Sequence, residues 1–324
     1  MYIHSKKVKF ISIIQLLITI SKYEQLIVSK VLVEETSIIK FILMIFVSCR
    51  PLLIGTGIKV IISGISWILR EDKNVIITLK DSFHGRTITT LAATGQEHYH
   101  ELFNPLTPGF IHTPANDFEA LKALAEQNKV CAIMLECVQG EGGVIALDDE
   151  YIKGIEALAK KYNFLIIVDE VQTGNGRTGK LYAYMNFGIT PDVVSTAKGL
   201  GGGLPIGAAL LSEKVENVLG FGDHGSTYGA NPVCSAAALT VINRLTDDFL
   251  AEVKQKSDYI FSEFESAKGV ESVSGMGLMV GIKTQKPAGD VVKDAMEKGV
   301  LCLTAKDKVR LLPALNIPFE DLKT

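Results

Sequence analysis

The sequence predicts an α/β fold, with a mostly parallel sheet in a large domain and a smaller α+β domain at the C-terminus. From about residue 74, short apolar runs alternate with helical patterns, as they do in a sheet whose strands are joined by helices. After about residue 247 this alternation stops and a different order of helices and strands follows. The chain has 324 residues, of which 47% are hydrophobic and 21% charged, so it is long and apolar enough for two globular domains.

The strands of the large domain are expected where apolar, β-branched runs occur. These runs cover residues 75–79, 131–137, 164–168, 193–196 and 207–211. Between them, Asp117 can cap a helix that runs through Ala125, and Asp148 or Asp149 can begin another with Ile152 on its apolar face. Strands that alternate with helices in this way predict a parallel sheet covered on both faces.

The C-terminal part is expected to form the small domain. A helix over residues 249–264 precedes two short strands within residues 270–282, then a helix over 290–297 and a strand over 308–312. We therefore predict a large domain over residues 71–247 and a small domain over residues 248–324.

Residues 1–70 differ from the rest in composition. They are crowded with Ile, Leu and Val and hold nine basic but only three acidic residues. The longest uncharged runs, 10–21 and 60–69, are shorter than the roughly 18 to 20 apolar residues of a membrane-spanning helix. Basic residues followed by an apolar stretch are typical of a signal peptide, but no cleavage site follows. We expect a frameshift or misplaced start here rather than a membrane anchor.

The overall charge and the cysteines exclude several classes of protein. A formal net charge of −3 gives no basic face for a nucleic acid. Five widely spaced cysteines without a CxxC pair are typical neither of a disulfide scaffold nor of a zinc site. We expect free thiols, no metal and a cytoplasmic protein.

Two polar residues follow predicted strands directly, at the sheet edge where α/β proteins bind ligands. Asp169 comes after the run 164–168, either as a helix cap or ion-pair partner or as the partner of a protonated ring nitrogen. Gln172, three residues on, can reach a neighbouring ring substituent. Lys198 comes after the run 193–196 and before several glycines, either as a surface lysine or as a partly desolvated, nucleophilic amine.

Other polar positions lie in the same kind of place. Phe83 and Arg86, after the first strand, offer a stacking face and an anion clamp, although a core aromatic in a turn is the alternative. Glu136 and Glu141 lie where a strand passes into a loop. The basic, Gly-rich turn over residues 173–180 suits an approach to an anion.

Two further positions favour anionic groups. The hydroxyls and amides around Ser226 and Thr227 suit a phosphate, especially before the helix expected after Pro232. Arg310 has the side chain that binds carboxylates in a bidentate manner.

Five motifs together resemble the class III, fold-type I aminotransferases, which depend on pyridoxal 5'-phosphate (PLP). They are FHGRT, E-x-x-QGEGG, DEVQTGxGRTGK, AKGLGGGLPIGA and HGSTYGxNP, and they occur in the family's order and spacing over roughly residues 74–322. The sequences GLGGGLPIGA and QTGNGRTGK favour the acetylornithine branch of that family.

The resemblance implies a set of cofactor contacts. Lys198 would form the Schiff base with PLP and carry the proton, and Asp169 would pair with the pyridinium nitrogen. Gln172 would contact the phenolic oxygen, and Phe83 would stack on the ring. The other implied cofactor contacts are His84, Glu170, Val171 and, from the neighbouring subunit of a homodimer, Thr227.

The resemblance also implies substrate contacts. Arg310 would bind the carboxylate of 2-oxoglutarate or glutamate, and Glu141 would pair with that arginine when the other substrate is bound. Ser226 and Arg86 would touch the substrate, and Glu136 would support the site from behind. The implied reaction moves the terminal amine of N2-acetylornithine to 2-oxoglutarate, a step of arginine biosynthesis.

One family feature has no counterpart. A phosphate-binding turn of the Ser-Gly-x-Glu-Ala-Asn type is expected before FHGRT, but residues 55–57 read Gly-Thr-Gly. Two alternatives therefore stay open. The chain is another class III enzyme, acting on ornithine, succinylornithine or 4-aminobutyrate, or it is an inactive fragment without the phosphate loop.

Overall fold

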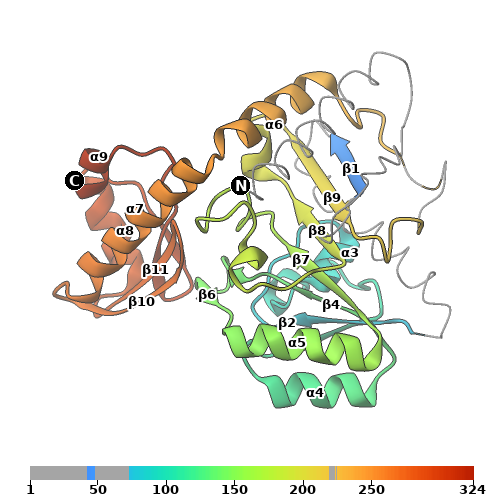
Figure 1. The fold of residues 1–324 in the computed structure, drawn as a ribbon. Helices are drawn as coiled ribbons and strands as arrows, with labels where there is room; N and C mark the ends of the chain where they lie inside the picture. Colours follow the sequence, from blue (N-terminus) through green and yellow to red (C-terminus); the bar gives the residue numbers. More distant parts are fainter. Residues whose placement is uncertain (1–41, 48–72, 219–222, 224) are drawn as a thin grey trace.

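A mixed, mostly parallel sheet forms the larger part of the protein (Figure 1). The computed structural model describes residues 42–47, 73–218, 223 and 225–324. In the order β1-β9-β8-β7-β4-β2-β3, the large sheet contains β1 (Ile42–Val47), β9 (Ile206–Leu211), β8 (Val193–Thr196), β7 (Leu165–Asp169), β4 (Val130–Leu135), β2 (Val75–Leu79) and β3 (Phe110–Thr113). The five strands from β8 to β3 are parallel, whereas β9 and β1 are antiparallel to their neighbours. The predicted α/β class is confirmed.

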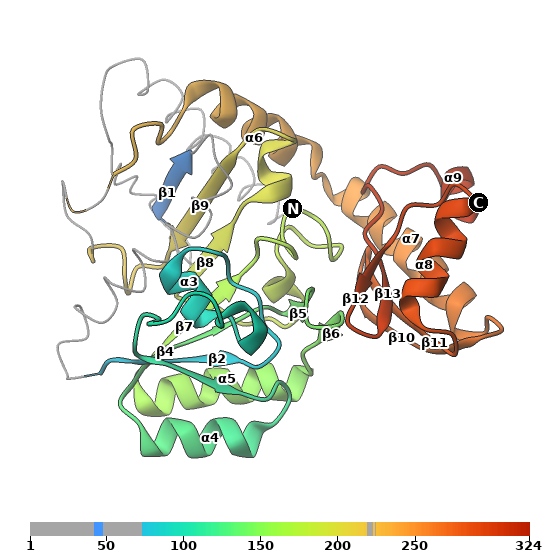
Figure 2. The same ribbon diagram turned by 180° about the vertical axis from the view of Figure 1, so that it is seen from behind.

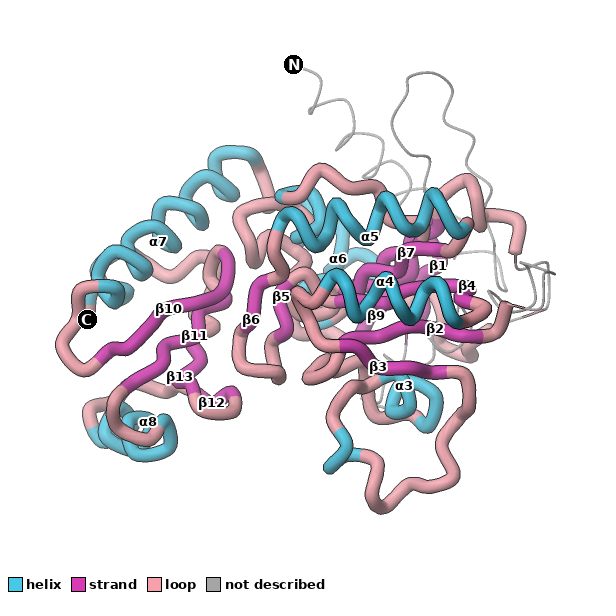
Figure 3. The backbone as a smooth tube through the Cα atoms, turned by 90° about the horizontal axis from the view of Figure 1, so that it is seen from below, coloured by secondary structure: helices cyan, strands magenta, loops and turns pink. Residues whose placement is uncertain are grey.

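Both faces of the large sheet are buried, as expected for parallel strands. Alternate residues of a strand belong to two separate clusters. Ile133 packs with α4 (Phe118–Gln127) and α5 (Asp149–Tyr162), whereas Ala132 packs with the end of α3 (Ile88–Ala93). Figure 3 shows α4 and α5 side by side on one face.

The C-terminal unit, residues 247–324, has a second sheet (Figure 2). Its antiparallel strands, in the order β10-β11-β13-β12, are β10 (Val270–Met276), β11 (Met279–Thr284), β13 (Lys308–Leu311) and β12 (Leu303–Ala305). The helices of this unit are α7 (Asp247–Glu265), α8 (Ala288–Glu297) and α9 (Phe319–Lys323). Val253 of α7 and Val280 of β11 meet in one apolar core, which joins helix and sheet.

One hairpin and four helices complete the described part of the chain. They are the hairpin of β5 (Val138–Gln139) and β6 (Ile145–Ala146), helix α6 (Pro232–Arg244) and the short helices η2 (Glu97–Tyr99), η3 (Ala183–Asn186) and η4 (Lys198–Gly201). The sequence did not predict α3, β3 or this hairpin. It also predicted no helix or strand within residues 1–70, where β1 lies. Within the described residues, no helix is both long and apolar enough to span a membrane.

Candidate active site

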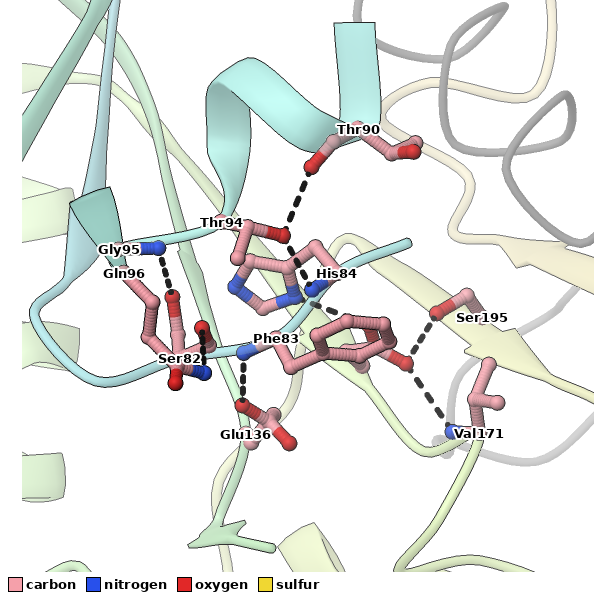
Figure 4. Close-up of polar contacts among 11 residues, drawn as sticks. Ser82, Phe83, His84, Thr90, Thr94, Gly95, Gln96, Glu136, Val171 and Ser195 are labelled. Carbon is pink, nitrogen blue, oxygen red and sulfur yellow. Dashed lines mark hydrogen bonds and ion pairs between the residues drawn. The ribbon is translucent and has the colours of Figure 1, made fainter. Parts of the chain in front are cut away.

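Asp169 is the last residue of β7 and lies beside Ser195 of β8. Its carboxylate is 4% exposed and has three partners. Oδ2 lies 2.9 Å from Nδ1 of His84, while Oδ1 accepts hydrogen bonds from the Val171 amide (3.1 Å) and the Ser195 hydroxyl (3.0 Å) (Figure 4). A buried carboxylate needs such partners, and these three also fix the direction in which it points.

His84 joins Asp169 to the segment that follows β2. Its amide donates to the Thr94 hydroxyl at 2.9 Å, and its ring is buried. Because the Asp169 carboxylate accepts a hydrogen bond from Nδ1 of His84, the proton of a neutral His84 ring is assigned to Nδ1. Nε2 is buried and has no hydrogen-bond partner among the described residues.

Glu136 follows β4 and supports the same segment, because Oε2 accepts the Phe83 amide at 3.0 Å (Figure 4). Burial raises the pKa of its carboxyl from 4.5 to about 7, against the lowering effect of the His84 charge. Asp169 raises this pKa and Lys198 lowers it, so the charges of both lie within electrostatic reach of Glu136. The groups that the sequence predicted separately are thus brought together.

The raised pKa of Glu136 predicts a pH-dependent stability. Between about pH 4.5 and 7 the unfolded chain loses this proton while the folded chain keeps it, so Glu136 destabilises the fold increasingly as the pH rises. Glu136→Gln keeps an acceptor for the Phe83 amide without the charge. We expect it to raise the midpoint of thermal unfolding at about pH 8 and to change it little near pH 4.5.

Thermal unfolding of both proteins across this pH range measures the effect. The exposed Glu150→Gln is the matched control and should shift the midpoint little at any pH. The prediction would be contradicted if Glu136→Gln raised the midpoint of thermal unfolding equally at about pH 8 and near pH 4.5.

Lys198 lies at the start of η4, with one residue between it and the end of β8, and its backbone has a φ of 46°. A non-glycine residue in this left-handed region is strained, and such strain gathers at functional sites. Asn175 holds the preceding turn by donating to the Thr196 hydroxyl and the Ala197 carbonyl, both at 3.1 Å. Lys198 itself is exposed, so the prediction of a partly desolvated amine is wrong.

Glu170 turns away from Asp169 into the protein. Its carboxylate accepts the Thr173 hydroxyl at 2.6 Å and the Tyr184 amide at 2.9 Å. Burial raises the pKa of this carboxyl to about 7. The implied contact of Glu170 with a cofactor stays a prediction, while its side chain closes the loop between β7 and η3.

Arg310 belongs to the C-terminal unit and contacts a site residue of the large unit. It lies on β13, is 7% exposed, and its guanidinium donates to Oε1 of Glu141 at 2.7 Å. Gln172 approaches the same oxygen at 3.5 Å, which is the limit of a hydrogen bond. The Oε1 atom of Gln172 and the Nε atom of Arg310 are buried without a partner among the described residues. Residues from the two units therefore converge where the sequence predicted a carboxylate site.

Arg86 is exposed and packs on aromatic rings. Its guanidinium carbon lies 4.2 Å from the ring centroid of Tyr99 and 5.4 Å from that of Phe83. The two rings meet edge to face at 5.7 Å. Tyr99 was not predicted as part of the site, because its sequence neighbours carry no motif.

The loop before α6 ends at a residue that caps the helix. Asn231 accepts hydrogen bonds from the Val233 and Cys234 amides at 3.0 and 3.3 Å, and Pro232 has no amide hydrogen. The start of α6 is thus already capped. The fit of the hydroxyls and amides around Ser226 and Thr227 to a phosphate stays a prediction. Ser226 is half-buried and Thr227 exposed. The Gly-Thr-Gly sequence at 55–57 and the first residue of HGSTYGxNP lie outside the described residues.

The fold and this arrangement define the class of protein. A buried carboxylate ends one parallel strand, an amine follows the neighbouring strand, and an arginine from the C-terminal unit adds an anion-binding group, as in α/β enzymes whose site lies at the carboxyl ends of the strands. The chain belongs to the class III aminotransferase family, which it matches over residues 53–324. The resemblance drawn from the five motifs is therefore confirmed, and the family depends on PLP.

Known relatives agree with this family. The chain is 51% identical over 255 residues to an acetylornithine aminotransferase from Haemophilus ducreyi, covering 78% of this chain but 65% of that enzyme. It is 42% identical over 266 residues to the acetylornithine aminotransferase of Methanocaldococcus jannaschii, covering 80% and 66%. The chain thus spans slightly less than two thirds of the length of these relatives.

Solved structures show the same fold. An N-acetylornithine aminotransferase from Stenotrophomonas maltophilia is 31% identical with a TM-score of 0.70, and the match covers 87% of this chain and 70% of that one. An ornithine aminotransferase from Toxoplasma gondii, with partial occupancy of PLP at its active site, is 28% identical with a TM-score of 0.78, covering 87% and 69%. The predicted fold type is confirmed.

Proposed function

We propose that this chain is a PLP-dependent acetylornithine aminotransferase. It would move the terminal amine of N2-acetylornithine to 2-oxoglutarate, giving N-acetylglutamate 5-semialdehyde and glutamate, in the arginine biosynthesis of the cytoplasm. The observation that carries the proposal is the buried carboxylate of Asp169 at the end of β7, beside the strand that leads to Lys198. The named relatives supply the substrate.

The residues present fit PLP. A carboxylate has about four acceptor positions. Asp169 uses three of them, for His84, Val171 and Ser195, which leaves one for the N–H of a pyridinium ring. Among the described residues, Oε1 of Gln172 is a buried polar atom without a partner, so it is free to accept a hydrogen bond from the cofactor. When bound, PLP supplies an electron sink that stabilises negative charge at the substrate carbon.

Each side chain then has a defined task. The Asp169 carboxylate holds a proton on the ring nitrogen, because a negative neighbour favours the positively charged form. The Lys198 amine acts as nucleophile and carries the proton at the substrate carbon. Arg310 binds a substrate carboxylate once Glu141 releases it, since both anions compete for the same guanidinium.

The subunit arrangement is also a proposal. We expect a homodimer in which Thr227 contacts the cofactor phosphate of the neighbouring subunit, and its exposed position supports such a contact. Sedimentation of the purified protein tests this arrangement. A monomer with full activity would contradict it.

A direct assay tests the reaction. Purified protein with PLP receives N2-acetylornithine and 2-oxoglutarate, and glutamate is measured by mass spectrometry. Ornithine, succinylornithine and 4-aminobutyrate serve as competing donors. A better rate with one of these would assign another class III substrate. A folded protein that yields no glutamate with any donor would indicate an inactive fragment.

The ion pair between Glu141 and Arg310 predicts a change in substrate affinity. Glu141→Gln removes the anion that competes with 2-oxoglutarate for Arg310. Since partly exposed ion pairs are weak, we expect the KM for 2-oxoglutarate to fall by only about two- to fivefold. Steady-state kinetics with 2-oxoglutarate as the varied substrate measure it.

A matched control separates this effect from a change of net charge. Glu119→Gln removes an exposed carboxylate that pairs with Lys122, so its KM should stay at the wild-type value. An unchanged or higher KM in Glu141→Gln would show that Glu141 does not compete for Arg310.

A further inference from the structure

Arg177 joins the loop that follows β7 to the C-terminal unit. Its Nη1 donates to the Leu278 carbonyl at 3.1 Å and to the Pro313 carbonyl at 2.6 Å. In return, the Leu278 amide donates to the Arg177 carbonyl at 2.9 Å. The approach is close, because a Cβ added at Gly277 would lie 2.3 Å from the Arg177 carbonyl oxygen. Burial lowers the pKa of the guanidinium to about 10, so it still carries its charge at neutral pH.

The two carbonyls occupy the open end of the β11–β13 ladder. The last paired residues there are Val280 and Leu311. Leu278 lies in the turn between β10 and β11, and Pro313 lies two residues after β13. Pro313 has no amide hydrogen, and the amide of Leu278 is used by Arg177. The guanidinium donates to both carbonyls, which lie outside the paired residues of the two strands.

This contact connects the two halves of the site. Arg177 lies five positions after Gln172, in the loop that begins beyond Asp169. Pro313 lies three positions after Arg310 on the chain that leaves β13. The position of the Arg310 guanidinium relative to Glu141 and Gln172 thus depends on how this end of β13 is held against the loop.

We propose that Arg177 is a positioning residue, which holds Arg310 in place for a substrate carboxylate by donating to Leu278 and Pro313. The inference rests on the proposed function, in which Arg310 binds that carboxylate. Arg177 itself touches neither substrate nor cofactor. The sequence predicted that the turn over 173–180 approaches an anion, and within that turn the arginine binds backbone carbonyls.

The test compares Arg177→Met with the double variant Arg177→Met, Pro313→Ala. Methionine removes the donors, and alanine at 313 supplies an amide hydrogen in the neighbourhood of the Leu278 carbonyl, which shares Nη1 with the Pro313 carbonyl. The probe is glutarate, a dicarboxylate without a keto group, titrated calorimetrically into the PLP-loaded protein. Arg177→Met should weaken glutarate binding by about tenfold, because small displacements of a positioning group are costly. The double variant should recover most of that loss, a rescue that a general packing role would not give.

The kinetics give a second readout. In Arg177→Met the KM for 2-oxoglutarate should rise in the same proportion as the Kd of glutarate, while kcat falls by less. Lys306→Met is the matched control, because Lys306 also links the β12–β13 turn to the large unit, through an exposed ion pair with Asp81. Its glutarate affinity should stay within about twofold of wild type, as expected for an exposed ion pair.

Several results would overturn the inference. One is a folded Arg177→Met that binds glutarate as wild type does, and another is a double variant that recovers nothing. If Arg177→Met does not unfold cooperatively, Arg177→Gln replaces it. The glutamine amide is shorter and cannot serve both carbonyls equally, so wild-type affinity in that variant would also overturn the inference.

The wild-type titration separates this inference from the function on which it rests. A wild-type protein that does not bind glutarate contradicts the carboxylate role of Arg310, and the inference about Arg177 falls with it. A wild type that binds glutarate, with Arg177→Met equal to it, contradicts the role of Arg177 alone.

Discussion

Replacing Lys198 by alanine is expected to reduce amine transfer by roughly 10⁴-fold or more, because one change removes both the nucleophile and the proton carrier. The fold should survive. Lys198 is exposed, and its neighbours Thr196 and Ala197 are held by Asn175 rather than by the lysine side chain. Alanine also accepts the left-handed backbone at this position no worse than lysine, since both carry a Cβ atom.

Two measurements check this result. Glutamate formation gives the rate, and visible absorbance after addition of PLP reports whether the cofactor becomes attached. Lys160→Ala removes another exposed lysine, on α5, and should leave both readouts at the wild-type level. A Lys198→Ala protein that retains even one hundredth of the wild-type rate would assign the proton transfer to another group.

The sequence predicted the parts of the fold that depend on long apolar runs. The run at 164–168 became a fully buried strand, and Asp117 caps α4 through the Ala120 amide, as expected. The runs at 131–137 and 308–312 ended one or two residues earlier than predicted. Element types followed from the periodicity of side chains, whereas their ends depended on tertiary contacts.

The sequence did not predict elements that are short or that mix polar and apolar residues without a clear period. β3 has the sequence FIHT and is only partly buried, so it shows neither an apolar run nor a clear alternation. α3 has six residues and a Thr87 that makes no side-chain cap, which removes the usual start signal. The β5–β6 hairpin has two residues in each strand and is defined by pairing alone.

The sequence predicted which residues belong to the site, but not which of them are in contact. His84 and Asp169 were both named, yet their hydrogen bond joins positions 85 residues apart in the chain. Ser195 was missed, because a serine inside an apolar strand carries no signal until its register beside Asp169 is known. The exposure of Lys198 and the capping role of Asn231 depend on side-chain directions that a motif does not contain.

Replacing Asp169 by asparagine is expected to lower kcat by about 10²- to 10³-fold, the size of effect found when one preorganised electrostatic partner is removed. The amide has no negative charge, so it no longer favours a proton on the ring nitrogen, and the ring becomes a weaker electron sink. Its oxygen can still accept from Val171 and Ser195, where Oδ1 accepts now. Its NH₂ group would face Nδ1 of His84.

His84 can adapt to that change, and this makes asparagine the informative replacement. Nε2 of His84 has no partner among the described residues, so the ring proton can move there and leave Nδ1 to accept from the amide. Thermal unfolding of Asp169→Asn should therefore stay close to wild type. Asp169→Ala leaves the Val171 amide, the Ser195 hydroxyl and the His84 ring without their acceptor, at about 1 to 3 kcal/mol for each buried group that stays unsatisfied.

The pair of variants separates charge from structure. Kinetics and thermal unfolding are measured on both, with the exposed Asp149→Asn on α5 as the matched control that should change neither. Loss of activity in Asp169→Asn without loss of stability assigns the effect to the missing negative charge. If Asp169→Asn keeps the wild-type kcat, the carboxylate serves only to hold His84, Val171 and Ser195 together, and the ring nitrogen needs no acidic partner in this protein.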